Sequence, residues 1–413
     1  MFSSKLAAYA DVAGAEVIDH LHQLARSLQG VRVVHVNSTK MGGGVAEILE
    51  QLVPMKRELG IDASWEVIEG NPAFFHVTKS FHNGLQGNAV ELTDADLQAY
   101  EQTNRDNVER LAPILKDADI VIIHDPQPAA LLNLMPKRRG KWIWRCHIDV
   151  SRPHRAVWKY LRPIVAPYDA SIFSLAAFAQ SLPNPQYLIP PSIDPLSAKN
   201  CELASADTDA VREEFGIDPA VPMALQVSRY DWFKDPVGVI RACRLARRYV
   251  PLQLVLAGGG AADDPESEAV LDAVRKEAGD DPDIHVLVLP ADAHHTINAL
   301  QRAADIVLQK STREGFGLTV TEAMWKGKPV IGGDTGGIVL QVIDYHTGFR
   351  VSTPEGAAFR MRYLLTHPEQ LDTMGLKARR FVHDHFLLTR HLREYLTLMV
   401  GLLHGSEERI ELG

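Results

Sequence analysis

The sequence has few cysteines and no long apolar run, and these absences argue against several classes of protein. Its three cysteines, Cys146, Cys201 and Cys243, lie far apart among 413 residues, without paired or metal-ligand spacing. This favours a reducing, cytoplasmic compartment over a disulfide-stabilised exterior. The first thirty residues carry acids and histidines in an amphipathic pattern, unlike a signal peptide. Because no apolar run could span a bilayer, we expect no membrane partner.

The sequence also lacks a block of charge of either sign. Its 52 acidic and 43 basic residues are spread along the chain and give a formal net charge of −9. A nucleic-acid groove needs a basic patch, so we expect no nucleic-acid partner. The pair His294 and His295 has no further ligand at metal spacing, and we predict no metal site.

The length and patterning of the chain predict two α/β domains. A chain of 413 residues exceeds what one hydrophobic core usually supports. Short apolar strands alternate with helical patterns in each half, as in parallel sheets covered on both faces. Prolines cluster around Tyr187-Leu-Ile189 and predict a stiff connection between the halves. We therefore predict two doubly wound domains, 1–190 and 191–385, with a helical segment 386–413 that returns to the first domain.

The predicted elements are as follows. Strands are expected at 31–36, 64–68, 120–123, 142–144, 170–173, 223–227, 252–256, 284–289, 304–309 and 329–331. Helices are expected at 45–59, 94–115, 155–165, 207–215, 237–249, 269–277, 318–325 and 379–403.

Two polar stretches follow strands of the second half. Glu314-Gly-Phe-Gly-Leu-Thr-Val-Thr-Glu322 places one glutamate in a loop and the other in the following helix. Ligands of open α/β sheets bind at this edge, and carboxylates accept hydrogen bonds from sugar hydroxyls. Arg229 and Lys234 follow another strand and suit a diphosphate. The alternative for each residue is an exposed charge without function.

Three further candidates lie in the first half. The loop Met41-Gly-Gly-Gly-Val45 could hold a phosphate on its amides, although it lacks the dinucleotide-binding G-x-G-x-x-G and could be a simple tight turn. Asp125 and His147 each follow a strand and could line a sugar pocket or be structural. The segment 70–90 combines long polar groups with aromatics, which is typical of carbohydrate sites and of many surface loops.

Together these stretches resemble the retaining glycosyltransferases of family 4 over nearly the whole chain. More narrowly, they are similar to the trehalose glycosyltransferring synthases. The narrower resemblance is carried by His35-Val-Asn-Ser-Thr-Lys-Met-Gly-Gly-Gly-Val-Ala-Glu-Ile-Leu49, Val67-Ile-Glu-Gly70, Thr78-Lys-Ser-Phe-His-Asn-Gly-Leu-Gln-Gly87 and Trp144-Arg-Cys-His-Ile-Asp149. The resemblance implies the GT-B architecture, in which two Rossmann-like domains face each other across a cleft.

The resemblance also implies roles for individual residues. Arg229 and Lys234 would hold the donor diphosphate, Glu314 the donor sugar and Glu322 the nucleotide ribose. The candidate catalytic residues are Arg229, Lys234, His147 and Glu314. The candidate donor-binding residues are Gly42, Gly43, Gly44, Gly315, Phe316, Gly317, Leu318 and Glu322. The candidate acceptor-binding residues are Asp125, Lys79, His82 and Asn83.

The activity implied is reversible, retaining transfer of glucose from ADP- or UDP-glucose to glucose, forming trehalose. Front-face attack is favoured, with the departing diphosphate taking the acceptor proton. We expect small-molecule partners and no tightly bound cofactor; Mg²⁺ is compatible but not required, and a homodimer is possible. The alternatives are a retaining trehalose phosphorylase that uses inorganic phosphate, a family 4 enzyme with another acceptor, and a catalytically silent nucleotide-sugar sensor.

Overall fold

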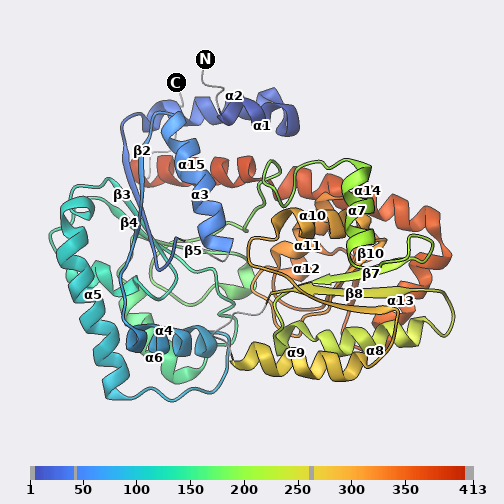
Figure 1. Ribbon diagram of the computed structural model, residues 1–413. Helices are drawn as coiled ribbons and strands as arrows, with labels where there is room; N and C mark the ends of the chain where they lie inside the picture. The colour runs from blue at the N-terminus through green and yellow to red at the C-terminus, as the bar shows by residue number, and fades with distance from the viewer. Residues whose placement is uncertain (1–4, 41–43, 260–264, 405–413) are drawn as a thin grey trace. The chain divides into compact units, whose positions relative to one another are not determined.

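The computed structural model describes residues 5–40, 44–259 and 265–404 (Figure 1). These residues form two compact units. The first contains the chain up to Pro191 together with the residues from Leu388 onward, and the second contains Ser192–Leu387. Within the described ranges, no helix is both long enough and apolar enough to cross a membrane.

The first unit contains one six-stranded sheet and helices on both faces of it. Its strands are β1 (Arg32–Asn37), β2 (Asp62–Val67), β3 (Ile120–His124), β4 (Lys141–Arg145), β5 (Ala170–Phe173) and β6 (Gln186–Leu188). Its α-helices are α1 (Lys5–Ala13), α2 (Ala15–Ala25), α3 (Gly44–Glu58), α4 (Pro72–Leu85), α5 (Asp94–Leu115), α6 (Arg155–Val165) and α15 (Leu388–His404).

The second unit repeats this plan with a second six-stranded sheet. Its strands are β7 (Met223–Val227), β8 (Gln253–Gly258), β9 (Ile284–Val288), β10 (Ile306–Gln309), β11 (Val330–Gly333) and β12 (Gly348–Val351). Its α-helices are α7 (Ser205–Glu214), α8 (Pro236–Ala246), α9 (Pro265–Ala278), α10 (His294–Ala303), α11 (Leu318–Trp325), α12 (Ile338–Gln341), α13 (Pro354–Thr366) and α14 (Pro368–His385).

Both sheets are parallel and both reverse their strand order near the middle. The orders are β2-β1-β3-β4-β5-β6 in the first unit and β12-β11-β10-β7-β8-β9 in the second. The order therefore reverses between β1 and β3, and again between β7 and β10. Loops that follow such neighbouring strands diverge and leave a crevice at the carboxyl ends, where ligands of doubly wound folds bind.

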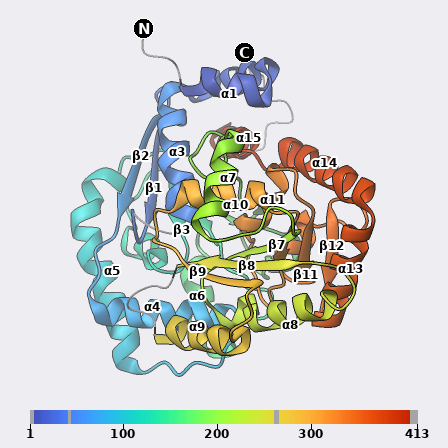
Figure 2. The same cartoon turned by 45° about the vertical axis from the view of Figure 1, so that its right-hand side comes forward.

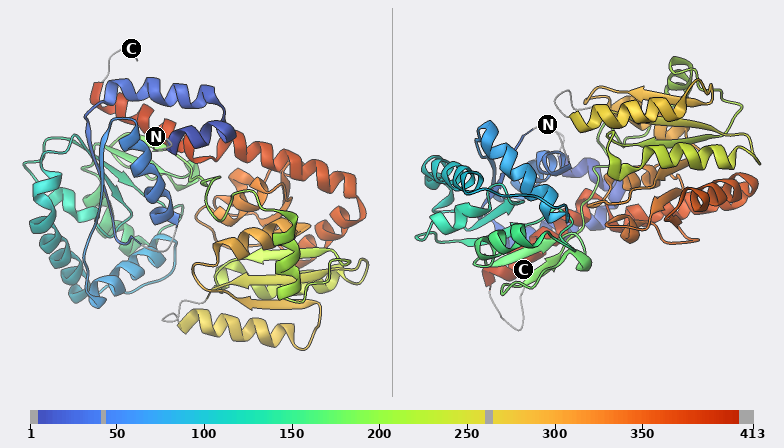
Figure 3. Two further views of the ribbon diagram at one scale, coloured as in Figure 1. Left: turned by 45° about the horizontal axis from the view of Figure 1, so that its top comes forward. Right: turned by 90° about the horizontal axis from the view of Figure 1, so that it is seen from below.

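Alternate residues of the first sheet pack into two different cores, as the period of two in a strand requires. Val34, Val121 and Trp144 belong to the core under α4, α5 and α6. Ile122 and Ile143 belong to the other core, which α1, α2, α3 and α15 cover. Figure 3 shows the red C-terminal helix α15 beside the blue N-terminal helices, where it packs against α2. The C-terminal helix thus completes the core of the first unit.

The second sheet is covered in the same way. Helices α8, α9 and α13 contribute apolar side chains to the core on one face of the sheet. Helices α10 and α11 contact β7 and β10, and they lie on the opposite side of the strands in Figure 2. This arrangement leaves the loops after β7 and β10 at the edge of the sheet rather than under a helix.

Most predicted elements are confirmed. Helices 94–115, 155–165 and 318–325 and strands 170–173 and 223–227 have the predicted bounds. Their patterns are long or strongly apolar and end at clear capping or turn residues, such as Thr93, which forms a capping box with Asp96.

Three expectations about secondary structure need correction. The segment 70–90, for which no helix was predicted, contains α4, which begins at the cap Asn71 with Pro72 in its first turn. The proline cluster does not form only a connection, because Gln186–Leu188 pairs with β5 as an edge strand, a position that tolerates flanking prolines. The helical run 379–403 is two helices, because the carbonyl of Phe386 accepts a hydrogen bond from Ile193 instead of continuing the helix.

Candidate functional site

In the second unit, the loops after β7 and β10 bring together two of the predicted site residues. Lys234 ends a short 3₁₀ turn after β7, and Glu314 lies in the loop after β10. The Lys234 Nζ atom lies 2.5 Å from Glu314 Oε2, and both side chains are largely buried. The two loops are also tied by their backbones, since Thr312 N donates to Phe233 O at 2.7 Å. The reversal point of this sheet therefore carries a preformed ion pair.

The Glu314 carboxylate is held on one side only. Besides Lys234, Ser311 Oγ and Gln309 Nε2 donate to the same oxygen, Oε2, at 3.1 Å and 3.4 Å. Among the described residues, Oε1 accepts no hydrogen bond. The network thus fixes the orientation of the carboxylate and leaves one oxygen for a ligand. Sequence reasoning missed Ser311 and Gln309, although their positions at the end of the same strand could have indicated them.

The backbone at Glu314 is packed against a glycine. A Cβ atom at Gly336 would lie 1.7 Å from the carbonyl oxygen of Glu314, and Gly336 has a φ of +49°. No other residue type fits without moving the loop. The neighbouring peptide of Phe316 is fixed from the same segment, because Gln341 Nε2 donates to Phe316 O at 2.6 Å. Glu314 therefore has little freedom to move.

Gly315, Phe316, Gly317 and Leu318 lead from Glu314 into α11. Gly317 is the N-cap of this helix, with a φ of +83°, and Leu318 is its first residue. The first N–H groups of a helix have no partner within the helix and favour anionic ligands. The structure thus places four predicted donor-binding residues at a helix N-terminus beside Glu314.

Glu322 is 5% exposed and lies on the second turn of α11. Within the described part of the chain, its carboxylate accepts no hydrogen bond. The buried ammonium of Lys326 lies one turn later and donates to the Glu322 carbonyl and to Asn200 Oδ1, at 3.2 Å and 3.0 Å. Burial lowers the pKa of Lys326 to about 7, while the negative charge of Glu322 opposes that shift. Sequence reasoning did not single out Lys326.

Arg229 stands apart from the Lys234 and Glu314 pair. Its side chain is 69% exposed, and its nearest acidic partner is Asp231, at 3.8 Å. The loop that carries Arg229 has a fixed path, because a Cβ atom at Gly258 of β8 would lie 1.8 Å from Ser228 O. Arg229 is thus an exposed cation on a rigid loop.

In the first unit, part of the predicted glycine loop lies outside the described residues. Gly42 and Gly43 are among the residues not described, whereas Gly44 is the first residue of α3. The structure therefore places only Gly44, at the amino end of the helix that follows β1.

Asp125 and His147 lie together at the carboxyl ends of β3 and β4. The Asp125 Oδ1 atom accepts a hydrogen bond from the backbone N–H of His147 at 2.7 Å. Asp125 has a φ of +64°, unusual for a residue other than glycine, which marks a conformation held by its surroundings. Burial raises the pKa of Asp125 to about 6. In this structure the Asp125 carboxylate thus binds the backbone of the loop that contains His147.

A row of buried polar side chains leads away from His147. His147 Nε2 lies 3.0 Å from His124 Nδ1, His124 Nε2 lies 3.0 Å from His35 Nδ1, and His35 Nε2 lies 2.7 Å from Lys56 Nζ. We call these four residues the histidine row. Sequence reasoning missed the row beyond His147.

The geometry of the sheet explains the histidine row. His35 pairs in register with Ile122 of β3, and His124 pairs with Arg145 of β4. Each step from His35 to His124 to His147 crosses one strand and advances two residues, so the three rings stay on one face. Adjacent rings are stacked, with centroids 5.3 Å apart in both pairs.

Lys79, His82 and Asn83 all lie on α4. The buried side of that helix, with Phe74 and Phe81, belongs to the core on the other face of the sheet from the histidine row. Lys79 is exposed, whereas His82 and Asn83 are half-buried. These three predicted acceptor-binding residues therefore share one helix.

Comparison with known proteins identifies the family of this chain. Residues 35–180 match the family model "Trehalose synthase, N-terminal domain", and residues 207–381 match "Glycosyl transferases group 1". Trehalose synthase from Pyrococcus horikoshii is 45% identical over 403 residues, which cover 96% of each chain. The chain belongs to the trehalose synthase family of glycosyltransferases.

Two further matches, one in sequence and one in structure, relate this chain to other proteins. A trehalose phosphorylase from Pleurotus pulmonarius is 30% identical over 455 residues, which cover 97% of this chain and 61% of the phosphorylase. The structure of a UDP-forming α,α-trehalose-phosphate synthase from Burkholderia xenovorans, in complex with glucose-6-phosphate, matches with a TM-score of 0.72 at 14% identity. That match covers 90% of this chain and all of the other, and it shows the GT-B fold.

One observation concerns the binding of metal ions. In the described residues, no group of three or more His, Cys, Asp or Glu side chains is arranged to hold a metal ion.

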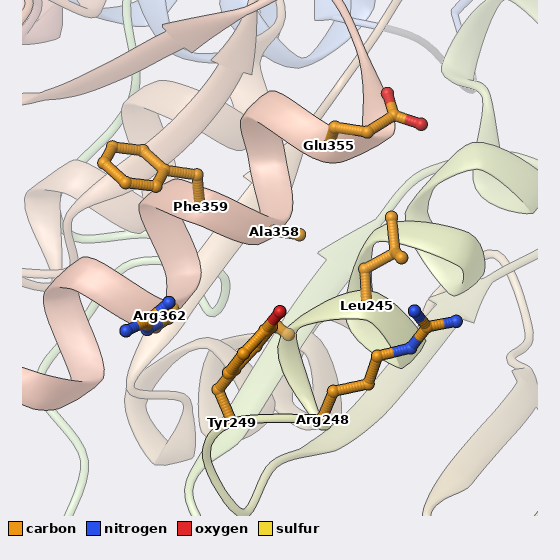
Figure 4. Close-up of a pocket in the computed structure, with 8 residues that line it drawn as sticks. Leu245, Arg248, Tyr249, Glu355, Ala358, Phe359 and Arg362 are labelled. Carbon is orange, nitrogen blue, oxygen red and sulfur yellow. The ribbon is translucent and has the colours of Figure 1, made fainter.

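A pocket between α8 and α13 is lined by Tyr249, Phe359 and Arg362 among others (Figure 4). The Arg362 guanidinium stacks over the Tyr249 ring at 4.6 Å, and none of the predicted site residues lines this pocket.

Replacement of Gly336 by alanine tests the rigidity of Glu314. Gly336→Ala should push the Glu314 backbone aside, and we expect glycosyltransferase activity to fall by about a hundredfold, as a misplacement of about 1 Å can cause. The control is Gly216→Ala, since Gly216 also has a positive φ, +65°, but has open space around it. Both variants carry the same type of backbone strain, so equal activities in an initial-rate assay would contradict the role of the contact.

The histidine row predicts that acid destabilises the protein. Burial, followed by the charges of Arg145 and Lys56, lowers the pKa of His124 from 6.5 to about 3. Below pH 6.5 the unfolded chain therefore takes up a proton that native His124 does not. The stability present above that pH is lost as the pH falls, by about 1.4 kcal/mol per pH unit for one such group.

His124→Asn should therefore flatten the dependence of the free energy of unfolding on pH. Urea unfolding would be measured at several pH values from neutral down to about pH 5. His22→Asn, at an exposed position of α2, is the control. Parallel curves for the wild type and His124→Asn would contradict the prediction.

Proposed function

We propose that this protein transfers glucose from a nucleoside diphosphate glucose to free glucose, with retention at the anomeric carbon, and forms trehalose reversibly. The observation that carries this proposal is the match to a trehalose synthase over 96% of both chains. The Lys234 and Glu314 pair at the reversal point of the second sheet supports it, because that is where the fold binds ligands.

The second unit would bind the donor. Lys234 would hold the diphosphate, and the free Oε1 of Glu314 would accept hydrogen bonds from sugar hydroxyls. Arg229, exposed and on a rigid loop, would supply the second cation. The buried carboxylate of Glu322 would accept hydrogen bonds from the ribose. The amides from Gly315 to Leu318 would lie by the sugar and phosphates.

The first unit would select the acceptor. His147 would hydrogen-bond the donor sugar near its reacting carbon, and Asp125 would contribute to the acceptor pocket. Lys79, His82 and Asn83 on α4 are the other acceptor candidates. Gly44, with Gly42 and Gly43, would lie beside the diphosphate at the amino end of α3.

The chemistry would proceed by attack on the same face as the leaving group. The anomeric hydroxyl oxygen of free glucose forms a bond to C1 of the donor sugar, the bond from C1 to the β-phosphate oxygen breaks, and the hydroxyl proton passes to that oxygen. Arg229 and Lys234 stabilise the charge that develops on the diphosphate. With two cations supplying this neutralisation, the proposal does not require Mg²⁺, and exclusion of water from the closed site limits donor hydrolysis.

A trehalose phosphorylase activity is the second candidate, because a phosphorylase is also a relative. In that reaction inorganic phosphate takes the place of the nucleoside diphosphate. The higher identity to the trehalose synthase, 45% against 30%, favours the synthase reaction over the phosphorylase reaction.

One experiment separates the two activities. The protein is incubated with trehalose and, in separate reactions, ADP, UDP, GDP or inorganic phosphate, and the products are analysed by mass spectrometry and NMR. We expect a nucleoside diphosphate glucose and free glucose. Formation of glucose phosphate from inorganic phosphate only would replace the proposal with a phosphorylase, and no product in any reaction would contradict both.

Arg229→Ala tests the donor site. Loss of one cation that stabilises the leaving group should lower kcat by roughly a hundredfold or more. Arg380→Ala is the matched control, since Arg380 is exposed on α14 and pairs only within its helix, with Asp384. Initial rates at saturating donor would be compared, and near-normal turnover of Arg229→Ala would exclude this role.

A further inference from the structure

The histidine row has two different ends. One end is His147, whose ring keeps part of its surface exposed and whose Nδ1 makes no hydrogen bond within the described residues. The other end is Lys56, which is fully buried on α3. Its ammonium also lies 4.8 Å from the centre of the Tyr395 ring. Every ring nitrogen between these ends is paired with the next member of the row.

The rings of the histidine row are neutral at ordinary pH. Burial lowers the pKa of His35 and of His147 well below the usual value, and nearby cations lower both further. A neutral imidazole has one nitrogen that donates a hydrogen bond and one that accepts. In a row of neutral rings joined nitrogen to nitrogen, the tautomer of one ring therefore dictates the tautomer of the next.

Lys56 determines the direction of the row. Below about pH 7, where Lys56 is charged, its ammonium can only donate, so His35 Nε2 must accept and His35 Nδ1 must carry the proton. The same alternation makes His124 Nε2 an acceptor and His124 Nδ1 a donor. His147 Nε2 then accepts from His124, and His147 Nδ1 carries the proton.

Among the described residues, no hydrogen bond takes these protons to a group outside the row. Arg145, which pairs in register with His124, carries positive charge near the rings of the row, and Arg390 carries positive charge near His391. His391 and Tyr395 face the row from α15, and Glu394 pairs with Arg390 at 2.5 Å. The Asp125 carboxylate accepts from the backbone of His147 and not from its ring. The cations around the row favour neutral rings but do not determine which ring nitrogen carries the proton. The hydrogen bond from Lys56 determines it.

We propose that Lys56 is a positioning residue that acts through His35 and His124 to fix His147 as the tautomer with its proton on Nδ1. Given the proposed function, His147 then presents an N–H donor to a hydroxyl oxygen of the donor sugar. The wrong tautomer would present a lone pair, and the sugar would have to donate its own proton instead. The row thus connects a lysine inside the core with the chemistry at the sheet edge.

The first test uses the wild-type protein and needs no activity. Histidines are labelled with ¹⁵N, and two-bond ¹H–¹⁵N spectra, with His147 assigned from a His147→Asn variant, report which ring nitrogen carries the proton. Burial lowers the pKa of Lys56 to about 7, so spectra are recorded below that pH, where Lys56 is charged. We expect the proton on Nδ1 in all three rings, and a His147 ring protonated on Nε2 overturns the proposal.

The second test compares two replacements of the lysine. Lys56→Met keeps an unbranched side chain of similar length without a donor, whereas Lys56→Arg keeps a side chain that can only donate. In Lys56→Met we expect a mixture of His147 tautomers and a fall in kcat/KM of about tenfold, the effect of one hydrogen bond. Lys56→Arg should restore the single tautomer and most of the activity, because its guanidinium can only donate.

A control separates positioning from general destabilisation. Leu52→Ala opens a cavity on the same helix, at a residue buried among apolar side chains of the same core. It should lower the free energy of unfolding and leave the His147 tautomer unchanged. An unchanged tautomer in Lys56→Met contradicts the role of Lys56. If the wild-type spectrum is as expected but glucosyl transfer is absent, the proposed function fails and the tautomer control stands.

Discussion

Parallel pairing of neighbouring strands is the constraint on which the rest of this protein depends. It brings all carboxyl ends of a sheet to one edge, and the reversal of strand order opens that edge between β1 and β3 and between β7 and β10. Lys234 and Glu314 meet because their strands are neighbours at such a point, although eighty residues separate them. The period of two within each strand then decides which side chains share a face, and it produces the row from His35 to His147.

Buried cations have different hydrogen-bond partners in the two units. In the second unit Lys234 is balanced by the Glu314 carboxylate. In the first unit Lys56 and Arg145 are fully buried, and within the described residues their side chains bond to a histidine and a serine rather than to a carboxylate. A buried charge without a counter-charge costs stability, which is why the pKa of Lys56 falls to about 7. The buried polar side chains of the first unit therefore lower its stability.

Much of the fold could be predicted from the sequence because apolar strands and capped helices are local signals. The helix 94–115 is an example, since its N-cap and its periodicity both lie within the segment. The break at Phe386 could not be predicted, because the competing hydrogen bond comes from Ile193, far away in the chain. The histidine row was missed for the same reason: strand register makes neighbours of His35 and His124, and the packing of α3 on the sheet brings Lys56 to His35. Lys234 and Glu314 could be singled out as candidates because each lies in a loop that follows a strand.

The path of the chain has a consequence for how the protein is made. The core of the first unit needs α15, whose Leu392, Leu396 and Met399 are buried among residues from the beginning of the chain. During synthesis the second unit, Ser192–Leu387, emerges complete while the first still lacks this helix. The first unit leaves the ribosome first but is the last to complete its core. Its apolar face stays uncovered while nearly two hundred further residues are translated.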